Sequence, residues 1–243
     1  MDIKETNRKI WKTNKAIFHS HKGVVFKRYY KSGNAVADYR LLQKINKTYS
    51  NKNTKKWEYR PLSVNGYDKE KNTLSMELIK GESVRNLFLK YKDPALYWHF
   101  GAWLGGLHQS TSSSDGLVIV FNDYNRSNVV INFEDKEVVA LDPGEYTKLR
   151  AHPSISFVIG IFSVIRGALL VRPLSVLSCV HNFINGYESF HSTPDSLFPG
   201  IKHLFFRLWE GSSKPFLHDY AGIRVASPVI ECALVYLVYL VAK

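Results

Sequence analysis

The sequence has only two cysteines among its 243 residues, Cys179 and Cys232. Two thiols exclude a disulfide-stapled fold and a cysteine-based zinc cluster, because both need more of them. The opening residues contain no apolar segment typical of a secretory signal, and no run reaches the roughly 18 uncharged apolar residues of a membrane-spanning helix. These absences favour a reducing, cytoplasmic setting. Disorder is excluded as well, because 45% of the residues are hydrophobic and can fill a core.

Acidic residues are scarce in the first quarter of the chain. Residues 1–60 contain 16 Lys and Arg but 4 Asp and Glu, whereas residues 61–243 contain 17 of each, so the net charge of +12 lies in this basic segment. Such a segment attracts nucleotide phosphates, nucleic acid, acidic lipid headgroups or phosphorylated glycans, although a solvated surface without a partner would carry the same charge. No zinc finger and no RNA-binding aromatic motif accompanies it, which argues against nucleic acid.

The first 80 residues predict a small sheet with one helix. After a polar lead-in, two strands are predicted at 15–20 and 23–30, followed by a helix at 35–45. A polar loop at 46–56 then leads to two further strands, at 57–68 and 73–79. The strands are rich in β-branched and aromatic residues, and the helix has apolar residues at helical spacing. The strand at 57–68 is expected to end in a turn at Asn65-Gly66.

After Gly81 the pattern becomes mainly helical. Two helices are predicted first, at 83–91 and 95–110. Three short apolar runs follow, at 117–121, 129–133 and 138–141. The remainder is predicted to be helical, with breaks near Pro173, Pro194, Pro199 and Pro215. Two apolar stretches, 155–165 and 232–242, are shorter than a membrane span and are expected to be buried helices. The second is expected to dock on the domain rather than lie in a membrane interface.

The residues with the clearest chemistry lie between positions 121 and 146. Asp123 precedes Asn128 by five positions, and Asn128 leads into an apolar run; a second run, after a turn, ends at Asp142. A hairpin of the two runs would bring Asn128 and Asp142 together, with Asp123 on the loop before them. Two carboxylates and an amide suit Mg²⁺, and a carboxylate kept off the metal can orient or deprotonate a hydroxyl. Ordinary turns use the same residue types.

This stretch resembles the catalytic loop of the protein-kinase-like fold. It is most similar to the small-molecule branch, which contains the aminoglycoside and choline phosphotransferases and the lipopolysaccharide-core sugar kinases. That branch carries His-Gly-Asp, four further residues and Asn, followed by a hydrophobic strand that ends in a metal-binding Asp. The resemblance implies that Asp123 is the catalytic base and that Asn128 and Asp142 hold Mg²⁺. Arg126, inside the loop, would meet the transferred phosphate or a neighbouring acid.

Weaker matches follow in the family's order over residues 15–190. Residues 24–29 resemble the strand that bears the phosphate-binding lysine, which implies that Lys27 has this role. The next helix in the family carries an acidic residue that pairs with the lysine, and the matching position is Asp38. Residues 74–84 resemble the hinge, which implies adenine contacts from Glu77, Leu78 and Ile79. The ordinary alternative is that Lys27 is a basic surface residue and Asp38 a solvated helix residue.

The sequence also departs from the family's pattern. Phe121 stands at the position of the catalytic-loop His and Asn122 at that of the Gly, and Asp38 is one methylene shorter than the usual Glu. The metal-binding segment begins Asp142-Pro143-Gly144 rather than Asp-Phe-Gly. No glycine-rich phosphate loop joins the first two predicted strands, which offer only His21, Lys22 and Gly23.

The expected fold class is α+β: a two-lobed, kinase-like fold with a small antiparallel-sheet lobe at 1–79 and a mostly helical lobe at 80–243. The function that the resemblance implies is an ATP- and Mg²⁺-dependent kinase for a hydroxyl group of a sugar-containing small molecule or glycolipid, similar to the lipopolysaccharide-core sugar kinases. Its partners would be ATP, this acceptor and, through the basic segment and the apolar C-terminus, the anionic inner face of the cytoplasmic membrane.

Two other functions remain open at this point. Phe121 and Asp38 favour a pseudokinase that acts as a binding or scaffold module, whereas the set of Asp123, Asn128 and Asp142 opposes it. A small protein kinase is the other alternative. The missing glycine-rich loop, the absent Asp-Phe-Gly and the lack of an Ala-Pro-Glu segment argue against it.

Overall fold

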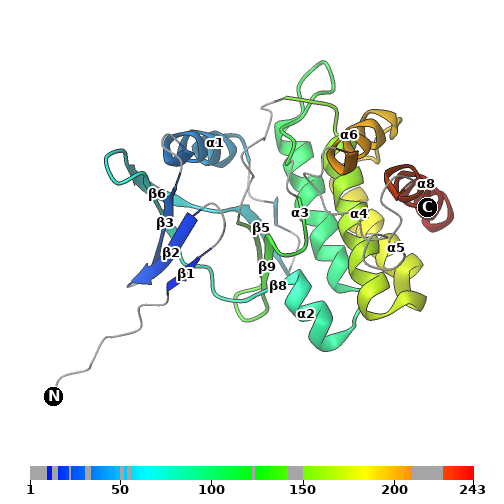
Figure 1. Cartoon of the computed structure of the whole chain (residues 1–243), viewed down its shortest axis with the longest axis horizontal. Coiled ribbons are helices and arrows are strands. Elements are labelled where there is room, and N and C mark those ends of the chain that lie inside the picture. The colour runs from blue at the N-terminus through cyan, green and yellow to red at the C-terminus, as the bar shows by residue number, and fades with distance from the viewer. Residues whose placement is uncertain are drawn as a thin grey trace. The chain divides into compact units, whose positions relative to one another are not determined.

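The computed structural model describes residues 10–12, 16–21, 23–30, 34–49, 52–53, 56–121, 124–141, 150–209 and 227–243 (Figure 1). The chain divides into two compact units. The first unit comprises residues 1–50 and 61–80, and the second comprises residues 51–60 and 81–243.

The first unit is an antiparallel sheet of five strands with one helix packed on it. The strand order is β1-β2-β3-β7-β6. The strands are β1 (Ile10–Lys12), β2 (Ala16–His21), β3 (Val24–Tyr29), β6 (Val64–Asp68) and β7 (Thr73–Glu77). The helix α1 (Asn34–Thr48) contacts β3, β6 and β7. Its buried face consists of residues at helical spacing, namely Ala35, Asp38, Leu42 and Ile45.

The first 80 residues differ from the prediction in four places. β1 adds a strand where a polar lead-in was expected, and β4 (Lys52–Asn53) lies within the predicted polar loop. The predicted strand 57–68 is two strands in different sheets, because β5 (Glu58–Pro61) pairs in the second unit. The expected turn at Asn65-Gly66 is wrong: these residues lie inside β6, where the register with β7 shifts as in a β-bulge, and the turn follows at 69–72.

The second unit combines a second sheet with a group of helices. Its strand order is β4-β5-β10-β9-β8, with β8 (Glu82–Ser83), β9 (Val129–Asn132) and β10 (Glu137–Ala140). The helices are α2 (Val84–Tyr91), α3 (Leu96–Thr111), α4 (Ser154–Val171), the 3₁₀ turn η1 (Pro173–Ser175), α5 (Val176–Glu188), α6 (Phe198–Trp209) and α8 (Ser227–Ala242). The predicted α+β class, with a small antiparallel sheet in one part and a mainly helical second part, is confirmed.

The proline breaks largely fall where they were expected. Pro173 begins η1 directly after α4, and Pro194 lies between α5 and α6. Pro199 does not break a helix but occupies the first turn of α6, where a missing N–H costs no hydrogen bond. Pro215 lies outside the described residues.

Helices α3 and α5 pack backbone against backbone through three glycines. A Cβ at Gly101 would lie 1.9 Å from the carbonyl oxygen of Phe183, and one at Gly105 would lie 2.3 Å from that of Tyr187. From the other helix, a Cβ at Gly186 would lie 2.0 Å from the carbonyl oxygen of Trp98. These contacts leave no room for a side chain, so glycine is required for this helix crossing.

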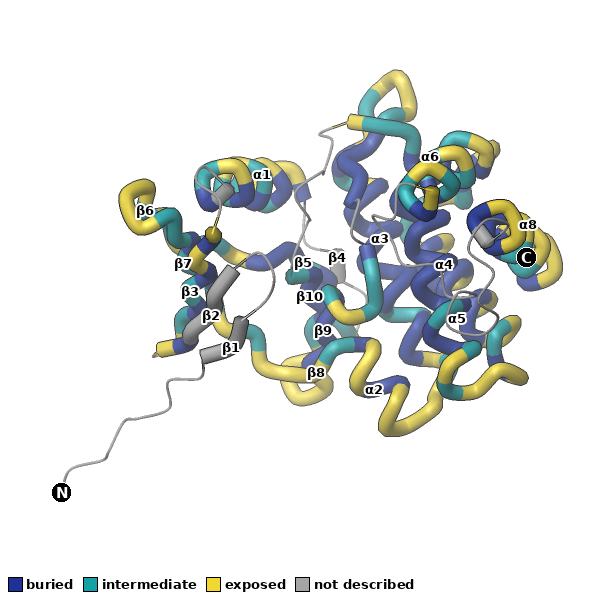
Figure 2. Tube along the Cα trace, viewed as in Figure 1, coloured by how far each residue is buried: buried dark blue, intermediate teal, exposed yellow. Residues whose placement is uncertain are grey.

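Helix α4 is largely buried within the second unit (Figure 2). By length and composition it could cross a membrane, yet 72% of its 18-residue window is buried inside the structure, as in the core helix of a globular protein. The prediction of a buried helix at 155–165 is therefore confirmed. α8 also docks on the domain as expected, because it contacts α4, α5 and α6 through its buried Cys232, Val235 and Tyr239.

Gly101→Ala tests the glycine crossing of α3 and α5. We expect the free energy of unfolding to fall by about 1–3 kcal/mol, because the added methyl overlaps a backbone carbonyl and the helices must separate. Urea denaturation followed by circular dichroism measures this change. Gly66→Ala is the control, since a Cβ there meets its nearest neighbour at 3.8 Å. If Gly101→Ala and Gly66→Ala had the same free energy of unfolding, the close backbone contact between α3 and α5 would be contradicted.

Candidate functional site

The hairpin of β9 and β10 forms in the predicted register. Val129 pairs with Ala140 and Asn132 with Glu137, and the Leu141 N–H donates to the Asn128 carbonyl at 2.7 Å. Asn128 and Leu141 therefore lie side by side at one end of the hairpin. Asp142, the next residue, and Asp123 lie outside the described residues, so their predicted roles stay predictions.

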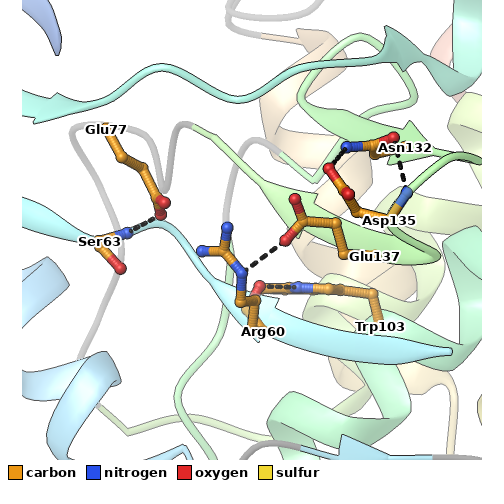
Figure 3. Close-up of polar contacts among 7 residues, drawn as sticks. All are labelled: Arg60, Ser63, Glu77, Trp103, Asn132, Asp135 and Glu137. Atoms are coloured by element: carbon orange, nitrogen blue, oxygen red, sulfur yellow. Dashed lines mark hydrogen bonds and ion pairs between the residues drawn. The ribbon is translucent and has the colours of Figure 1, made fainter. Parts of the chain in front are cut away.

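The opposite end and the flank of the hairpin are fixed by polar contacts (Figure 3). Asn132 donates to the Asp135 carboxylate at 2.7 Å across the turn, and Arg60 of β5 pairs with Glu137 of β10 at 2.8 Å. The Trp103 indole N–H of α3 donates to the Arg60 carbonyl at 2.8 Å. These contacts tie the hairpin to its neighbouring strand and to α3.

The predicted catalytic loop, between α3 and β9, is hydrogen-bonded to α4. The Phe121 N–H donates to the Ser156 hydroxyl at 2.8 Å, and the Arg126 N–H donates to the Ser163 hydroxyl at 3.1 Å. The two serines are seven residues apart, so they lie on one face of the helix. They fix the loop on both sides of Asp123.

The same face of α4 carries two glycines that make room for neighbouring side chains. A Cβ at Gly160 would lie 2.6 Å from the Phe183 ring of α5 and 3.3 Å from the Tyr124 ring of the loop. A Cβ at Gly167 would lie 1.4 Å from a guanidinium nitrogen of Arg126. Residues 156, 160, 163 and 167 thus form a stripe of small residues on which the loop lies. We call this set the α4 stripe.

Phe121, which stands where the resemblance leads one to expect a histidine, has its side chain in the core. Its exposed fraction is 1%, and its ring lies 5.3 Å from that of Trp103. Tyr124 stacks on Phe100 at 4.4 Å with an angle of 2° between the rings, and its hydroxyl donates to the Phe100 carbonyl. Aromatic packing therefore holds the loop on the side facing α3.

Arg126 is partly buried and lies between α3 and α4. Its guanidinium occupies the space above Gly167, beside the Tyr97 hydroxyl. Burial lowers the pKa of Arg126, and the positive charges of Arg85 and Arg166 lower it further, whereas Tyr97 opposes the shift. Burial also raises the pKa of Tyr97, so this phenol stays protonated. The site therefore concentrates positive charge at the loop.

Lys27 and Asp38 form the pair that the resemblance implied. The ammonium of Lys27 on β3 lies 3.3 Å from the carboxylate of Asp38 on α1, and their side chains are 9% and 7% exposed. The Tyr29 hydroxyl donates to the same carboxylate. Asp38 is thus long enough to reach the lysine, which excludes the solvated alternative for both residues.

The backbone N–H groups of two predicted hinge residues, Glu77 and Leu78, already donate hydrogen bonds within the first unit. The Glu77 N–H donates to the Ser63 carbonyl at 3.2 Å, and the Leu78 N–H donates to the Gly23 carbonyl at 2.9 Å. The Glu77 carboxylate accepts from the Ser63 N–H (Figure 3). Adenine contacts at Glu77 and Leu78 would therefore use their carbonyls, and Ile79 is the candidate for a donated hydrogen bond.

Sequence reasoning missed Ser156, Ser163 and the two glycines of the α4 stripe. The available signal was four small residues at helical spacing in an otherwise apolar helix.

His108 was expected to pack in the core, and this is confirmed: it is fully buried, and its Nδ1 atom lies 2.7 Å from the Tyr187 hydroxyl. Burial holds the pKa of His108 well below its usual value, with a smaller contribution from His191.

No family model and no curated protein matches this sequence. Solved structures do. A choline/ethanolamine kinase family protein from Mesorhizobium loti matches with a TM-score of 0.55 and 9% identity over 98% of this chain and 89% of its own. The chain therefore has a two-lobed, kinase-like α+β fold.

Two aminoglycoside phosphotransferases show the same likeness. APH(2'')-Ib, bound to ADP, has a TM-score of 0.53 and 12% identity over 99% of this chain and 95% of its own. The aminoglycoside 2'-phosphotransferase-IIIa, in complex with GDP, has a TM-score of 0.51 and 8% identity over 96% of this chain and 94% of its own. At these identities the likeness concerns the fold.

Ser156→Ala and Ser163→Ala test the anchoring of the loop. Each variant leaves a backbone N–H without its acceptor, so we expect a loss of about 1–3 kcal/mol of unfolding free energy for the fully buried Ser156. In Ser163→Ala, the amide of Arg126 should exchange faster with deuterium while α4 itself stays protected. Ser178→Ala on the exposed face of α5 is the control. Unchanged exchange at Arg126 would show that the loop does not need α4.

Asp38→Asn tests the buried ion pair. The variant keeps the size of the side chain but removes the negative charge that lies 3.3 Å from the buried Lys27 ammonium, so we expect a loss of about 3 kcal/mol of unfolding free energy. Asp68→Asn is the matched control, because Asp68 pairs with Lys71 at 3.5 Å on the surface, where such pairs contribute little. If both variants were equally stable, Lys27 and Asp38 would not form a buried pair in solution.

Proposed function

We propose that this chain is an ATP- and Mg²⁺-dependent phosphotransferase that phosphorylates a hydroxyl group of a sugar-containing small molecule or a glycolipid. One observation carries the proposal: the catalytic loop is fixed on α4, and its last residue, Asn128, pairs with Leu141, which directly precedes Asp142. The neighbours' bound ADP and GDP support a nucleotide as the phosphate donor.

The donor set at the hairpin end fits Mg²⁺. The proposed ligands are the side-chain oxygens of Asn128 and Asp142, and hard oxygen donors that leave positions for water and phosphate are those that Mg²⁺ prefers. Among the described residues, no cluster of three His, Cys, Asp or Glu side chains offers another site. When bound, the metal would neutralise charge on the nucleotide phosphates.

The chain's own residues would supply positioning and proton transfer. Lys27 would contact the α- and β-phosphates, and Asp38 holds its ammonium in place. Asp123 would orient the acceptor hydroxyl and accept its proton as the phosphorus–oxygen bond forms. The hydrogen bonds of the Phe121 and Arg126 N–H groups fix the described residues of the loop, and positioning is the main requirement of phosphoryl transfer.

Charge and hydropathy support the choice of acceptor and location. The basic segment at 1–60 would attract an anionic glycolipid or the inner face of a cytoplasmic membrane. The outward face of α8 adds exposed apolar side chains, among them Leu237, Leu240 and Val241. An acceptor of the lipopolysaccharide-core type, reached from the cytoplasm, fits both features.

A pseudokinase is the second candidate function. The argument for it is that Phe121 and Asp38 depart from the pattern of the kinases that the sequence resembles. Phe121 fills a place in the aromatic core without moving the loop away from Ser156. Asp38 reaches Lys27 despite its shorter side chain. Both departures are therefore compatible with a working site, which favours the enzyme. A small protein kinase has less support, since the three solved structures compared above are named as a choline/ethanolamine kinase family protein and two aminoglycoside phosphotransferases.

The experiment measures Mg²⁺-dependent loss of the γ-phosphate from ATP, with and without a panel of sugar and glycan acceptors. We expect Asp123→Asn and Asp142→Asn each to lower transfer by at least about a hundredfold, with an unchanged circular dichroism spectrum. Asp135→Asn, at the opposite end of the same hairpin, is the control and should keep wild-type turnover. Wild-type turnover in either test variant would refute the assignment.

A further inference from the structure

The outward face of α8 is apolar and exposed (Figure 2). The exposed residues recur at helical spacing and are 44–70% exposed: Val229, Ile230, Tyr236, Leu237, Leu240 and Val241. The only charged residue of α8, Glu231, is completely buried. A helix whose outer side meets water shows the reverse pattern, with its charges outside and its apolar residues inside. The outward face of α8 is therefore suited to an apolar partner.

Helix α6 extends this apolar surface. Phe198, Phe206 and Trp209 are 71%, 48% and 63% exposed, and they recur at helical spacing on one side of α6. A groove of about 660 Å³ joins the two helices, because Phe198 of α6 and both Tyr236 and Leu240 of α8 line it. A contiguous exposed apolar surface marks an interaction site. We call the exposed apolar residues of α6 and α8, together with the groove, the α6–α8 face.

Positive charge prevails at the α6–α8 face. Lys202 is exposed on α6, and Lys243 is exposed directly after α8. The two helices add no exposed acid within residues 198–209 and 228–242, and among the described residues that line the groove Asp195 is the one carboxylate. Apolar side chains that include Trp and Tyr, bordered by lysines, are typical of helices that lie in the interface of an anionic membrane.

The length of α8 excludes a membrane span and favours a helix that lies along the surface. Its 16 residues rise about 24 Å, whereas the hydrocarbon core of a bilayer is roughly 30 Å thick. The inner side of α8 also packs on α4, α5 and α6. One side of α8 thus belongs to the protein core, and the other is available to lipid.

A second copy of the chain suits the α6–α8 face less well. In a two-fold dimer the same patch of each copy meets the other. Two faces that each carry Lys202, Lys243 and one aspartate would bring together surfaces with a net positive charge, which costs affinity. An anionic lipid surface complements both the lysines and the apolar side chains.

We propose that the α6–α8 face binds the surface of an anionic membrane. Its apolar side chains would enter the boundary between headgroups and acyl chains, and Lys202 and Lys243 would lie at the lipid phosphates. The inference deepens the proposed function by naming the surface that meets the membrane, and it rests on that function for an acceptor in the same membrane. Binding itself needs neither nucleotide nor acceptor, so the two claims are tested separately.

The test is flotation of the full chain with vesicles of phosphatidylcholine and phosphatidylglycerol, and with vesicles of phosphatidylcholine alone. We expect at least about tenfold tighter binding to the mixed vesicles, because their anionic headgroups attract the lysines. The double variant Leu237→Gln, Leu240→Gln should weaken this binding at least about tenfold, since it removes apolar surface that the membrane would bury.

A matched control removes two leucines elsewhere in the second unit. Leu89 of α2 and Leu170 of α4 are 49% and 52% exposed, close to the 58% and 53% of Leu237 and Leu240. The double variant Leu89→Gln, Leu170→Gln should bind the mixed vesicles as the wild type does. A general loss of hydrophobicity would weaken both double variants equally.

Lys202→Glu tests the contribution of charge. Binding to the mixed vesicles should weaken about tenfold, and binding to phosphatidylcholine alone should change little. Lys136→Glu, in the exposed turn between β9 and β10, is the control and should bind as wild type.

Melting and sedimentation without vesicles distinguish the membrane from other occupants of the α6–α8 face. We expect Leu237→Gln, Leu240→Gln to melt at the wild-type temperature as a monomer, because the two side chains are exposed in the free chain. A clearly lower melting temperature would show that another segment of the chain covers the face. A wild-type dimer that the variant dissociates would show that a second copy does. Either result would overturn the inference.

The inference also fails if the chain does not bind the mixed vesicles, or if the Leu237→Gln, Leu240→Gln variant binds them as tightly as the wild type. These failures leave the proposed function intact when Asp123→Asn and Asp142→Asn still lower phosphate transfer. Vesicle binding by a chain that transfers no phosphate would refute the enzyme and leave the membrane surface in place.

Discussion

The predicted catalytic loop reaches helix α4 through its backbone, and two hydrogen bonds from the loop to Ser156 and Ser163 hold it there. This close approach needs small residues on one helix face, since Gly167 makes room for Arg126 and Gly160 makes room for Phe183 of α5 and for Tyr124. A larger residue in the α4 stripe would push the loop away and shift the described groups that it carries.

Patterns of local sequence predicted much of the fold. The β9–β10 hairpin was predictable because two apolar runs flank a polar turn, and the Lys27–Asp38 pair followed from a resemblance in strand and helix order. The turn at Asn65-Gly66 failed because a β-bulge accommodates the same residues. The glycine crossing of α3 and α5 and the α4 stripe depend on which helices meet in space, which local periodicity does not encode. Asp123 and Asp142 remain predictions from the motif.

Charge is distributed unevenly along the sequence. The basic segment carries the whole excess, because residues 1–60 contain 16 Lys and Arg against 4 Asp and Glu, whereas residues 61–243 are neutral as a whole. An excess of this kind attracts anions over a long range, and added salt weakens the attraction.

The central claim is that the end of the β9–β10 hairpin is a magnesium–nucleotide site. Calorimetric titration of ATP into the wild-type chain and Asp142→Asn, with and without Mg²⁺, tests it most directly. The account predicts binding that depends on Mg²⁺ and is lost in Asp142→Asn. Absence of ATP binding under every condition, or Mg²⁺-dependent binding that Asp142→Asn leaves unchanged, would contradict it.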